Sequence, residues 1–306
     1  MLNLIRYKNL LMLAFMQLLF RYGFLKLQKI DLALADWQYG LLVLSTILIA
    51  AAGYVINDIF DQQTDQINKP NKVIVGKSIS ETKAYNIYAF LNVSGVAIGF
   101  YLANVIMRPN FAAIFVLIAA ILYIYATSLK QMLLIGNLVV ALLLALSVVI
   151  IGIFDIFPAT DTANQDVMAG LFSILLDYAI FAFMINFLRE IVKDLEDFDG
   201  DNKQGMRTLA IVLGISKTTK LVFILNFAPI IALLYYINSY LVPNHLIAAT
   251  IYSLLFVLGP LLYFSIKLWT AATKNNFTIL SKVLKWILFF GILSILIISL
   301  NIKYHA

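Results

Sequence analysis

The sequence predicts an all-α membrane protein with nine transmembrane helices around a central cavity. The chain of 306 residues is 62% hydrophobic and only 12% charged, and its mean hydropathy is +0.93. A soluble domain usually carries about a quarter charged residues, so this apolar excess requires lipid as its surroundings. The apolar residues also form long stretches, and most charges gather between them.

Nine apolar stretches are each long enough to cross about 30 Å of hydrocarbon. They fall at 9–29, 39–60, 83–107, 111–129, 132–155, 170–193, 217–241, 245–269 and 283–302. Charges at Arg21 and Lys26 interrupt the first stretch, but no small-residue cleavage site follows it. It is therefore interpreted as a retained span rather than a signal peptide. A short polar hinge near Lys130 separates the fourth and fifth stretches.

The distribution of Lys and Arg predicts the orientation, because cytoplasmic loops carry an excess of these residues. With the N-terminus inside, all 22 Lys and Arg residues lie on the cytoplasmic side except Arg21, Lys26, Lys29, Arg108 and Lys303. The long polar loops 61–82 and 194–216 are then both cytoplasmic. We expect one multi-pass domain over residues 1–306 in the inner (cytoplasmic) membrane.

Composition excludes several kinds of site. The sequence has no Cys, which excludes disulfides and thiolate metal sites. Its two His residues, His245 and His305, are too few for a haem or zinc site. The net charge of +6 is interpreted as the bias of cytoplasmic loops, so no nucleic-acid partner is expected.

Two acidic motifs with identical spacing begin the two long loops. Their members are Asp58, Asp61 and Asp65 after the second span, and Asp194, Asp197 and Asp201 after the sixth. At about 100° per residue each triplet covers about 60° of a helix, so we expect three carboxylates on one face. Glu190 extends the second face by one turn. Two solvated helix ends are the alternative interpretation, which the duplicated spacing disfavours.

The acidic motifs favour a Mg²⁺ site. Carboxylates this close repel one another, and a helix C-terminus disfavours anions. Mg²⁺ prefers carboxylates together with phosphate oxygens. Basic residues accompany the two motifs, which suits a diphosphate neutralised from both sides; they are Lys69, Lys72, Arg189, Lys193, Lys203 and Arg207.

The loops after the motifs also resemble each other. Gly76 precedes Ser80, Gly214 precedes Ser216, and each Ser is expected to cap the next helix. Four spans separate equivalent points, which predicts a parallel repeat of halves at about 1–140 and 141–306. The motifs can then face each other across an apolar cavity. Tyr123, Tyr125 and Lys130 are the best candidates to line it, where aromatic rings could shield a carbocation.

Both motifs resemble those of the UbiA family of intramembrane prenyltransferases. Asn57, Asp58, Asp61 and Asp65 fill N-D-x-x-D-x-x-x-D, and Asp194, Asp197 and Asp201 fill D-x-x-D-x-x-x-D. Asn68-Lys69-Pro70, the nine spans and the inside N-terminus also match, so the resemblance covers the whole chain. It implies a helical barrel with a cavity open laterally to lipid. It also implies Mg²⁺-dependent ionisation of a prenyl diphosphate and attack by a lipophilic acceptor on the allylic cation.

The string Arg189-Glu190-Ile191-Val192-Lys193-Asp194-Leu195-Glu196-Asp197 most resembles the geranylgeranylglycerol-phosphate geranylgeranyltransferase branch. This implies a geranylgeranyl diphosphate donor and a lipid phosphate acceptor. One alternative is an aromatic acceptor in quinone synthesis. A remote alternative is an ion-coupled transporter, whose carboxylates should lie near the bilayer midplane instead. Val73-Ile74-Val75 departs from the family, in which many relatives have a basic residue and Pro.

The resemblance assigns roles to individual residues. The expected catalytic metal core is Asp58, Asp61, Asp194 and Asp197, completed by Asn57, Asp65, Glu190 and Asp201. The expected substrate-binding residues are Asn57, Asn68, Lys72, Tyr125, Lys130, Arg189 and Lys193. An acceptor that carries phosphate needs further bases near the cavity mouth, for which Arg6, Lys8 and Lys130 are the candidates.

Overall fold

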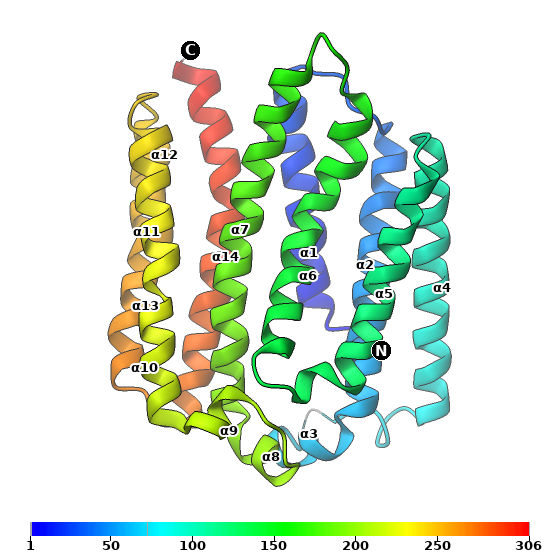
Figure 1. The fold of residues 1–306 in the computed structure, drawn as a ribbon, viewed down its shortest axis with the longest axis vertical. Coiled ribbons are helices and arrows are strands. Elements are labelled where there is room, and N and C mark those ends of the chain that lie inside the picture. The colour runs from blue at the N-terminus through cyan, green and yellow to red at the C-terminus, as the bar shows by residue number, and fades with distance from the viewer. Residues whose placement is uncertain (1, 72, 306) are drawn as a thin grey trace.

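The computed structural model describes residues 2–71 and 73–305 of the chain. Within this part, nine helical spans are long and apolar enough to cross a membrane, which confirms the predicted class (Figure 1). The spans are Tyr7–Gln28, Asp36–Phe60, Glu81–Val105, Pro109–Thr127, Ile135–Ala159, Gln165–Glu196, Ile215–Leu241, Ile247–Trp269 and Lys274–Tyr304. The last begins well before the expected residue 283. Phe277 and Leu280 are buried there, so packing extends the helix through a polar stretch.

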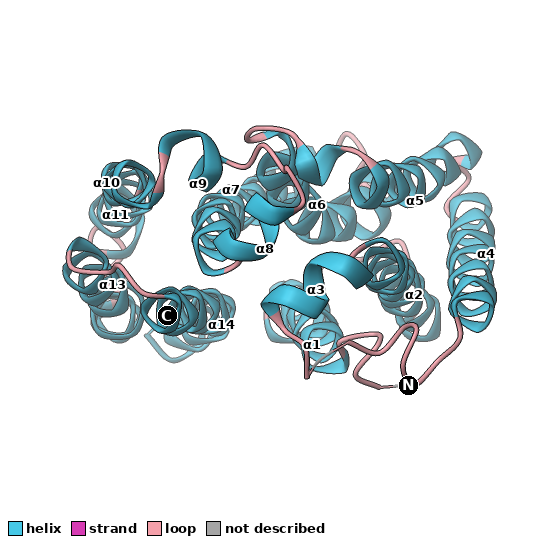
Figure 2. Ribbon diagram, turned by 90° about the horizontal axis from the view of Figure 1, so that it is seen from below, coloured by secondary structure: helices cyan, strands magenta, loops and turns pink. Residues whose placement is uncertain are grey.

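The long helices stand side by side, and three short helices cover one end of the bundle (Figure 1). The helices that build the spans are α1 (Tyr7–Gly23), α2 (Asp36–Phe60), α4 (Glu81–Val105), α5 (Ala112–Thr127), α6 (Ile135–Ile151), α7 (Gln165–Glu196), α10 (Ile215–Leu225), α11 (Phe227–Tyr236), α12 (Ile247–Tyr252), α13 (Gly259–Trp269) and α14 (Lys274–His305). The short ones are α3 (Gln62–Asn68), α8 (Phe198–Lys203) and α9 (Leu209–Leu213). Seen from the end that carries the short helices, α4 and the group α10–α13 lie at opposite extremes (Figure 2).

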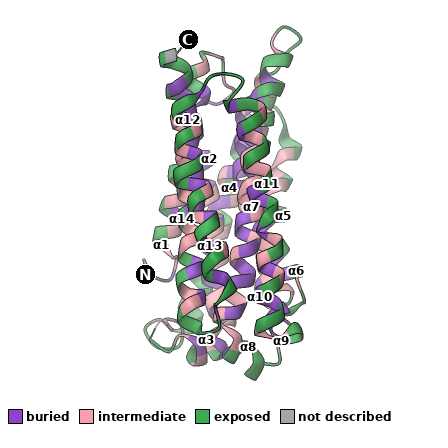
Figure 3. Ribbon diagram, turned by 90° about the vertical axis from the view of Figure 1, so that its left-hand side faces the viewer, coloured by how far each residue is buried: buried purple, intermediate pink, exposed green. Residues whose placement is uncertain are grey.

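Helix α7 connects the two largest hydrophobic clusters. Its first half, including Leu171 and Leu175, packs in a cluster with α1, α2 and α6. Its second half, including Ile191 and Leu195, packs with α10, α13 and α14. Exposed residues run along the outward faces of α11–α13 (Figure 3), and many are large and apolar, such as Ile266 at 70% exposure. An apolar outer surface of this kind requires lipid.

A buried ion pair closes the bundle at the end opposite the short helices. Arg21 on α1 contacts the carboxylate of Asp155, in the turn Gly152–Ile156, and both residues are almost fully buried. Asp155 also accepts a hydrogen bond from the amide of Leu34, at 3.0 Å. Removing one partner of such a pair costs about 3–5 kcal/mol, because the other charge stays buried. This pair therefore fixes α1, α2 and α6 relative to one another.

One of the two predicted serine caps is wrong. The Ser80 hydroxyl caps α4 by accepting a hydrogen bond from the amide of Lys83, at 3.4 Å. Ser216 instead lies inside α10, which begins at Ile215. The preceding Gly214 has φ +79°, a conformation that glycine adopts without strain, so it makes the turn into the helix.

Candidate active site

Each acidic motif lies where a long helix meets a short one. Asp61 separates α2 from α3, and Asp197 separates α7 from α8. Their backbones are nearly identical, with φ and ψ of −92° and 4° at Asp61 and −96° and 10° at Asp197. Each triplet therefore extends over two helices rather than one, because the chain bends at the middle Asp.

The two bends retain hydrogen bonding along the chain. The amide of Asp65 donates to the carbonyl of Asp61 at 2.8 Å, and that of Asp201 donates to Asp197 at 3.1 Å. Each junction therefore satisfies its backbone groups while turning the short helix across the end of the bundle. There α3 and α8 contact each other, which continuous helices would not do.

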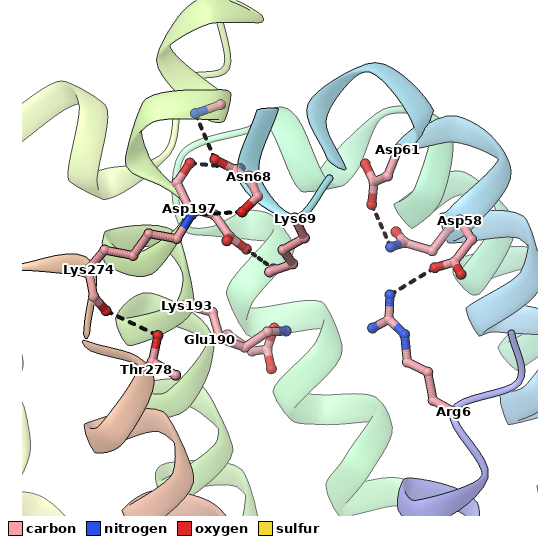
Figure 4. Close-up of polar contacts among 12 residues, drawn as sticks. Arg6, Asp58, Asp61, Asn68, Lys69, Glu190, Lys193, Asp197, Lys274 and Thr278 are labelled. Carbon is pink, nitrogen blue, oxygen red and sulfur yellow. Dashed lines mark hydrogen bonds and ion pairs between the residues drawn. The ribbon is translucent and has the colours of Figure 1, made fainter. Parts of the chain in front are cut away.

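Asn68, predicted to bind substrate, joins the two motifs instead of lining the cavity (Figure 4). Its side chain donates to the carbonyl of Asp197 at 3.0 Å and accepts from the amide of Gly200 at 2.9 Å. A Cβ at Gly200 would lie 2.3 Å from Nδ2 of Asn68, so only glycine allows this approach. Lys69 adds an ion pair with Asp197 at 2.6 Å, and Lys274 donates to the Asn68 carbonyl at 2.8 Å.

Bases from distant segments neutralise the first motif. Arg6 pairs with Asp58 at 2.9 Å, and Lys130 pairs with Asp61 at 2.5 Å (Arg6 and Asp58 in Figure 4). Asn57 donates its amide hydrogen to the other oxygen of Asp61 at 2.6 Å. Burial, with a smaller contribution from Asp61, raises the pKa of Asp65. Predicted residues Asn57, Asp61 and Lys130 thus form one hydrogen-bonded group, beside the separate pair of Arg6 with Asp58.

The second motif has fewer neutralising partners. Asp194 accepts a hydrogen bond from the neutral amide of Asn137 at 2.8 Å. Asp201 is 6% exposed, and its burial, together with the charges of Asp197 and Asp61, raises its pKa to about 7. Negative charge in this motif is therefore costly unless a further cation approaches.

Glu190, expected as a metal ligand, is engaged with two bases. Its carboxylate contacts Arg189 at 3.1 Å and Lys193 at 2.8 Å, and the residue is buried. In this arrangement Glu190 holds both bases against the wall of the cavity. Lys72, the remaining predicted base, lies outside the described residues.

The carboxylates are not gathered into a metal-ligand group of three or more within residues 2–71 and 73–305. The oxygens present nevertheless suit Mg²⁺. Oδ1 of Asn57 and Oδ1 of Asp197 are buried without a hydrogen-bond partner among the described residues. Buried oxygens of this kind normally have a donor or a cation beside them. Their hard oxygen chemistry fits Mg²⁺.

A cavity of about 320 Å³ begins at this polar end and continues between the helices. One face each of α1, α2, α5, α6, α7 and α14 lines it. On α1, for example, the lining residues Asn9, Leu13, Met16 and Phe20 recur every three or four positions. Six predicted residues lie at its polar end, namely Arg6, Asn57, Tyr125, Arg189, Glu190 and Lys193. The predicted cavity is therefore present, with mixed bases and amides at one end and apolar walls beyond.

Tyr123 was expected to line this cavity with Tyr125, and that expectation is wrong. Tyr123 is 44% exposed and packs against Phe60 and Tyr88. Two residues that are two positions apart on a helix point about 200° apart, so they cannot face the same space. Of these two tyrosines, Tyr125 lines the cavity and Tyr123 does not.

Several polar residues of the site were not anticipated from the sequence. Asn9, Tyr54, Asn186 and Lys285 line the cavity, and Asn137 binds Asp194. Their position in the sequence could have revealed them, because polar side chains inside apolar spans are costly and usually functional.

Comparisons with known proteins agree with this architecture. Residues 22–299 match the model of the UbiA prenyltransferase family. Digeranylgeranylglyceryl phosphate synthase of Thermococcus sibiricus is 35% identical over 63% of this chain and 62% of its own length. The Saccharolobus solfataricus enzyme of that name is 37% identical over 58% and 57%, and that of Methanosphaera stadtmanae is 33% identical over 70% and 72%. The chain thus spans less than two thirds of the first two relatives.

Solved structures show the same fold over nearly the full length. A structure of digeranylgeranylglyceryl phosphate synthase has a TM-score of 0.62 at 25% identity and covers 97% of this chain and 96% of that one. A UbiA homolog from Archaeoglobus fulgidus bound to GPP and Mg²⁺ has a TM-score of 0.58 at 16% identity, covering 96% and 98%. Together with the nine apolar spans, these comparisons establish a multi-pass membrane protein. The chain belongs to the UbiA prenyltransferase family.

Proposed function

We propose that this chain transfers a geranylgeranyl group from its diphosphate to a lipid that carries a glycerol phosphate. The observation that supports this most is the convergence of two acidic motifs, joined through Asn68 and Lys69. Their neighbours Asn57 and Glu190 line the polar end of an apolar cavity. Relatives named digeranylgeranylglyceryl phosphate synthase support the choice of acceptor. The domain would lie in the inner membrane with the acidic motifs on the cytoplasmic side.

In this proposal Asp58, Asp61, Asp194 and Asp197 hold Mg²⁺, with Asn57, Asp65 and Asp201 completing or orienting the set. Mg²⁺ bound there would neutralise the diphosphate and stabilise it as a leaving group. Bases now paired with these carboxylates, such as Arg6 and Lys130, can turn toward phosphate oxygens. The nearly identical bends at Asp61 and Asp197 support the proposed parallel repeat.

The cavity walls would bind the prenyl chain and exclude water. Asn9 and Phe20 both line the cavity, and the helix between them is about 16 Å long, room for several isoprene units. In the reaction, the bond between C1 of the prenyl group and the diphosphate oxygen breaks. The acceptor hydroxyl oxygen then bonds to C1, and its proton is taken up by the departing pyrophosphate. The apolar surroundings keep water from quenching the allylic cation.

The test is a transfer assay with purified protein in lipid nanodiscs. Radiolabelled geranylgeranyl diphosphate is supplied with Mg²⁺ or EDTA and with geranylgeranylglycerol phosphate, 4-hydroxybenzoate or dihydroxynaphthoate. We expect an ether product with the lipid phosphate that disappears in EDTA. Product formed only with an aromatic acceptor would contradict the proposed lipid phosphate acceptor. No product with any acceptor, together with no Mg²⁺-dependent diphosphate binding, would contradict prenyl transfer.

A further inference from the structure

We propose that Lys285, together with Asn9 and Arg189, forms a second anion site in the cavity wall, which binds the phosphate of the acceptor. This inference rests on the proposed function and deepens it, because it separates the acceptor phosphate from the donor diphosphate. The three residues come from α14, α1 and α7 and all line the cavity.

Lys285 is a charged residue inside a membrane span. It lies within Lys274–Tyr304, and its ammonium group donates to Oδ1 of Asn9 at 2.6 Å. Helices α14 and α1 lie side by side (Figure 2). A charge placed this way is costly, and such residues normally face a cavity and bind a ligand or a partner charge.

Among the residues that the structure describes, no carboxylate pairs with Lys285. Its hydrogen-bond partner Asn9 is neutral, and the charged groups close enough to influence it, Arg189 and Lys8, are cations. Arg189 and Lys193 in turn share the single carboxylate of Glu190. This part of the cavity wall therefore carries excess positive charge in apolar surroundings, and an anion would offset it.

Hydrogen-bond donors also remain available there. Nε of Arg189 is buried without a partner among the described residues. Nδ2 of Asn9 makes only a long hydrogen bond, at 3.3 Å, to the hydroxyl of Tyr54. A phosphate monoester offers three oxygens and close to two negative charges, which suits two cations and an amide donor.

The bases that serve the acidic motifs are different residues. Arg6, Lys130 and Lys69 pair with Asp58, Asp61 and Asp197 respectively. Asn9 lies in the first turn of α1, three residues after Arg6, which precedes the helix, so the two anion sites would be neighbours at this end of α1. A glycerol hydroxyl close to a phosphate held at Lys285 would then lie near C1 of the donor.

The test compares Lys285→Gln with a matched control, Lys282→Gln, which removes an exposed Lys one turn earlier on α14. With Lys285→Gln we expect the KM for geranylgeranylglycerol phosphate to rise about tenfold to a hundredfold, the loss typical of a charged hydrogen bond. The KM for geranylgeranyl diphosphate should change less than about twofold. Lys285→Arg should restore part of the loss, and Lys282→Gln should behave as wild type.

Direct binding separates this inference from the proposed function. Calorimetry with geranylgeranylglycerol phosphate should show binding to the wild type and a loss of affinity in Lys285→Gln, while the uncharged geranylgeranylglycerol should bind both proteins equally. Wild-type binding without ether product would sink the proposed function but leave this site standing. The site is overturned by unchanged affinity in folded Lys285→Gln, by absence of wild-type binding, or by an equal rise in the KM for the donor.

Discussion

The two acidic motifs have nearly the same backbone conformation, but different kinds of partner neutralise their negative charges. Both helices bend at the middle Asp with nearly the same dihedral angles. In the first motif, Arg6 and Lys130 neutralise Asp58 and Asp61. In the second, Asp194 has a neutral amide partner. Local structure therefore follows the repeated spacing, whereas compensation depends on which distant segments reach each motif.

Because of this difference, the second motif needs an added cation more than the first motif does. Burial, with the charges of Asp197 and Asp61, raises the pKa of Asp201 to about 7. The only ion pair of the second motif among the described residues is that of Asp197 with Lys69, which belongs to the loop of the first. The second motif therefore depends on the first for part of its compensation.

The largest effect is expected from replacing either middle Asp, because the shared bend gives them equivalent positions. Asp61→Asn and Asp197→Asn should each lower prenyl transfer by about 10²–10³-fold or more, the scale of removing one electrostatic contact to a transition state. Turnover under saturating substrates and Mg²⁺ measures this. Asp199→Asn, an exposed Asp on α8 outside the motif, is the matched control. Near wild-type turnover in folded Asp197→Asn would refute the equivalence.

A smaller effect is expected from separating the two motifs. In Gly200→Ala the new methyl group would meet Asn68, whose side chain joins α3 to α8. Overpacking of this kind costs about 1–3 kcal/mol, so Tm and transfer activity should both fall. Gly170→Ala on α7 is the control, because nothing lies within 4 Å of its added Cβ. Unchanged Tm and activity in Gly200→Ala would show that the contact between the motifs is dispensable.

The smallest effect concerns pH. The pKa of Asp201 is raised from its ordinary value of 3.8 to about 7 in the fold. Between these two pH values the folded state therefore keeps a proton that the unfolded state has lost. Stability should therefore fall as pH rises from about 4 to 7, by at most about 1.4 kcal/mol per pH unit from this group. Thermal unfolding in EDTA measures the slope, to which Asp65 contributes in the same direction. Asp201→Asn should reduce the slope of stability against pH. A slope equal to that of the wild type would show that Asp201 does not cause it.

Prediction from the sequence succeeded where one physical effect dominates. Hydrophobicity and length gave the nine spans, and the repeated spacing identified the two motifs. The bends at Asp61 and Asp197 were not predicted, because α3 and α8 turn only to contact each other. The pairing of Arg6 with Asp58 joins residues far apart in the sequence and needs the tertiary structure. Lys285 could have been noticed as a charge inside a span, but its partner Asn9 lies on the first helix.

A double-mutant cycle tests directly whether both motifs act on one diphosphate. The binding of geranylgeranyl thiodiphosphate with Mg²⁺ is measured for wild type, Asp61→Asn, Asp197→Asn and the double variant in nanodiscs. We expect each single variant to bind at least about tenfold more weakly and the double variant to bind little worse than either, because the effects of residues that serve one ligand are not additive. If the two losses of affinity multiply in the double variant, the motifs do not act on one diphosphate and instead form two independent sites.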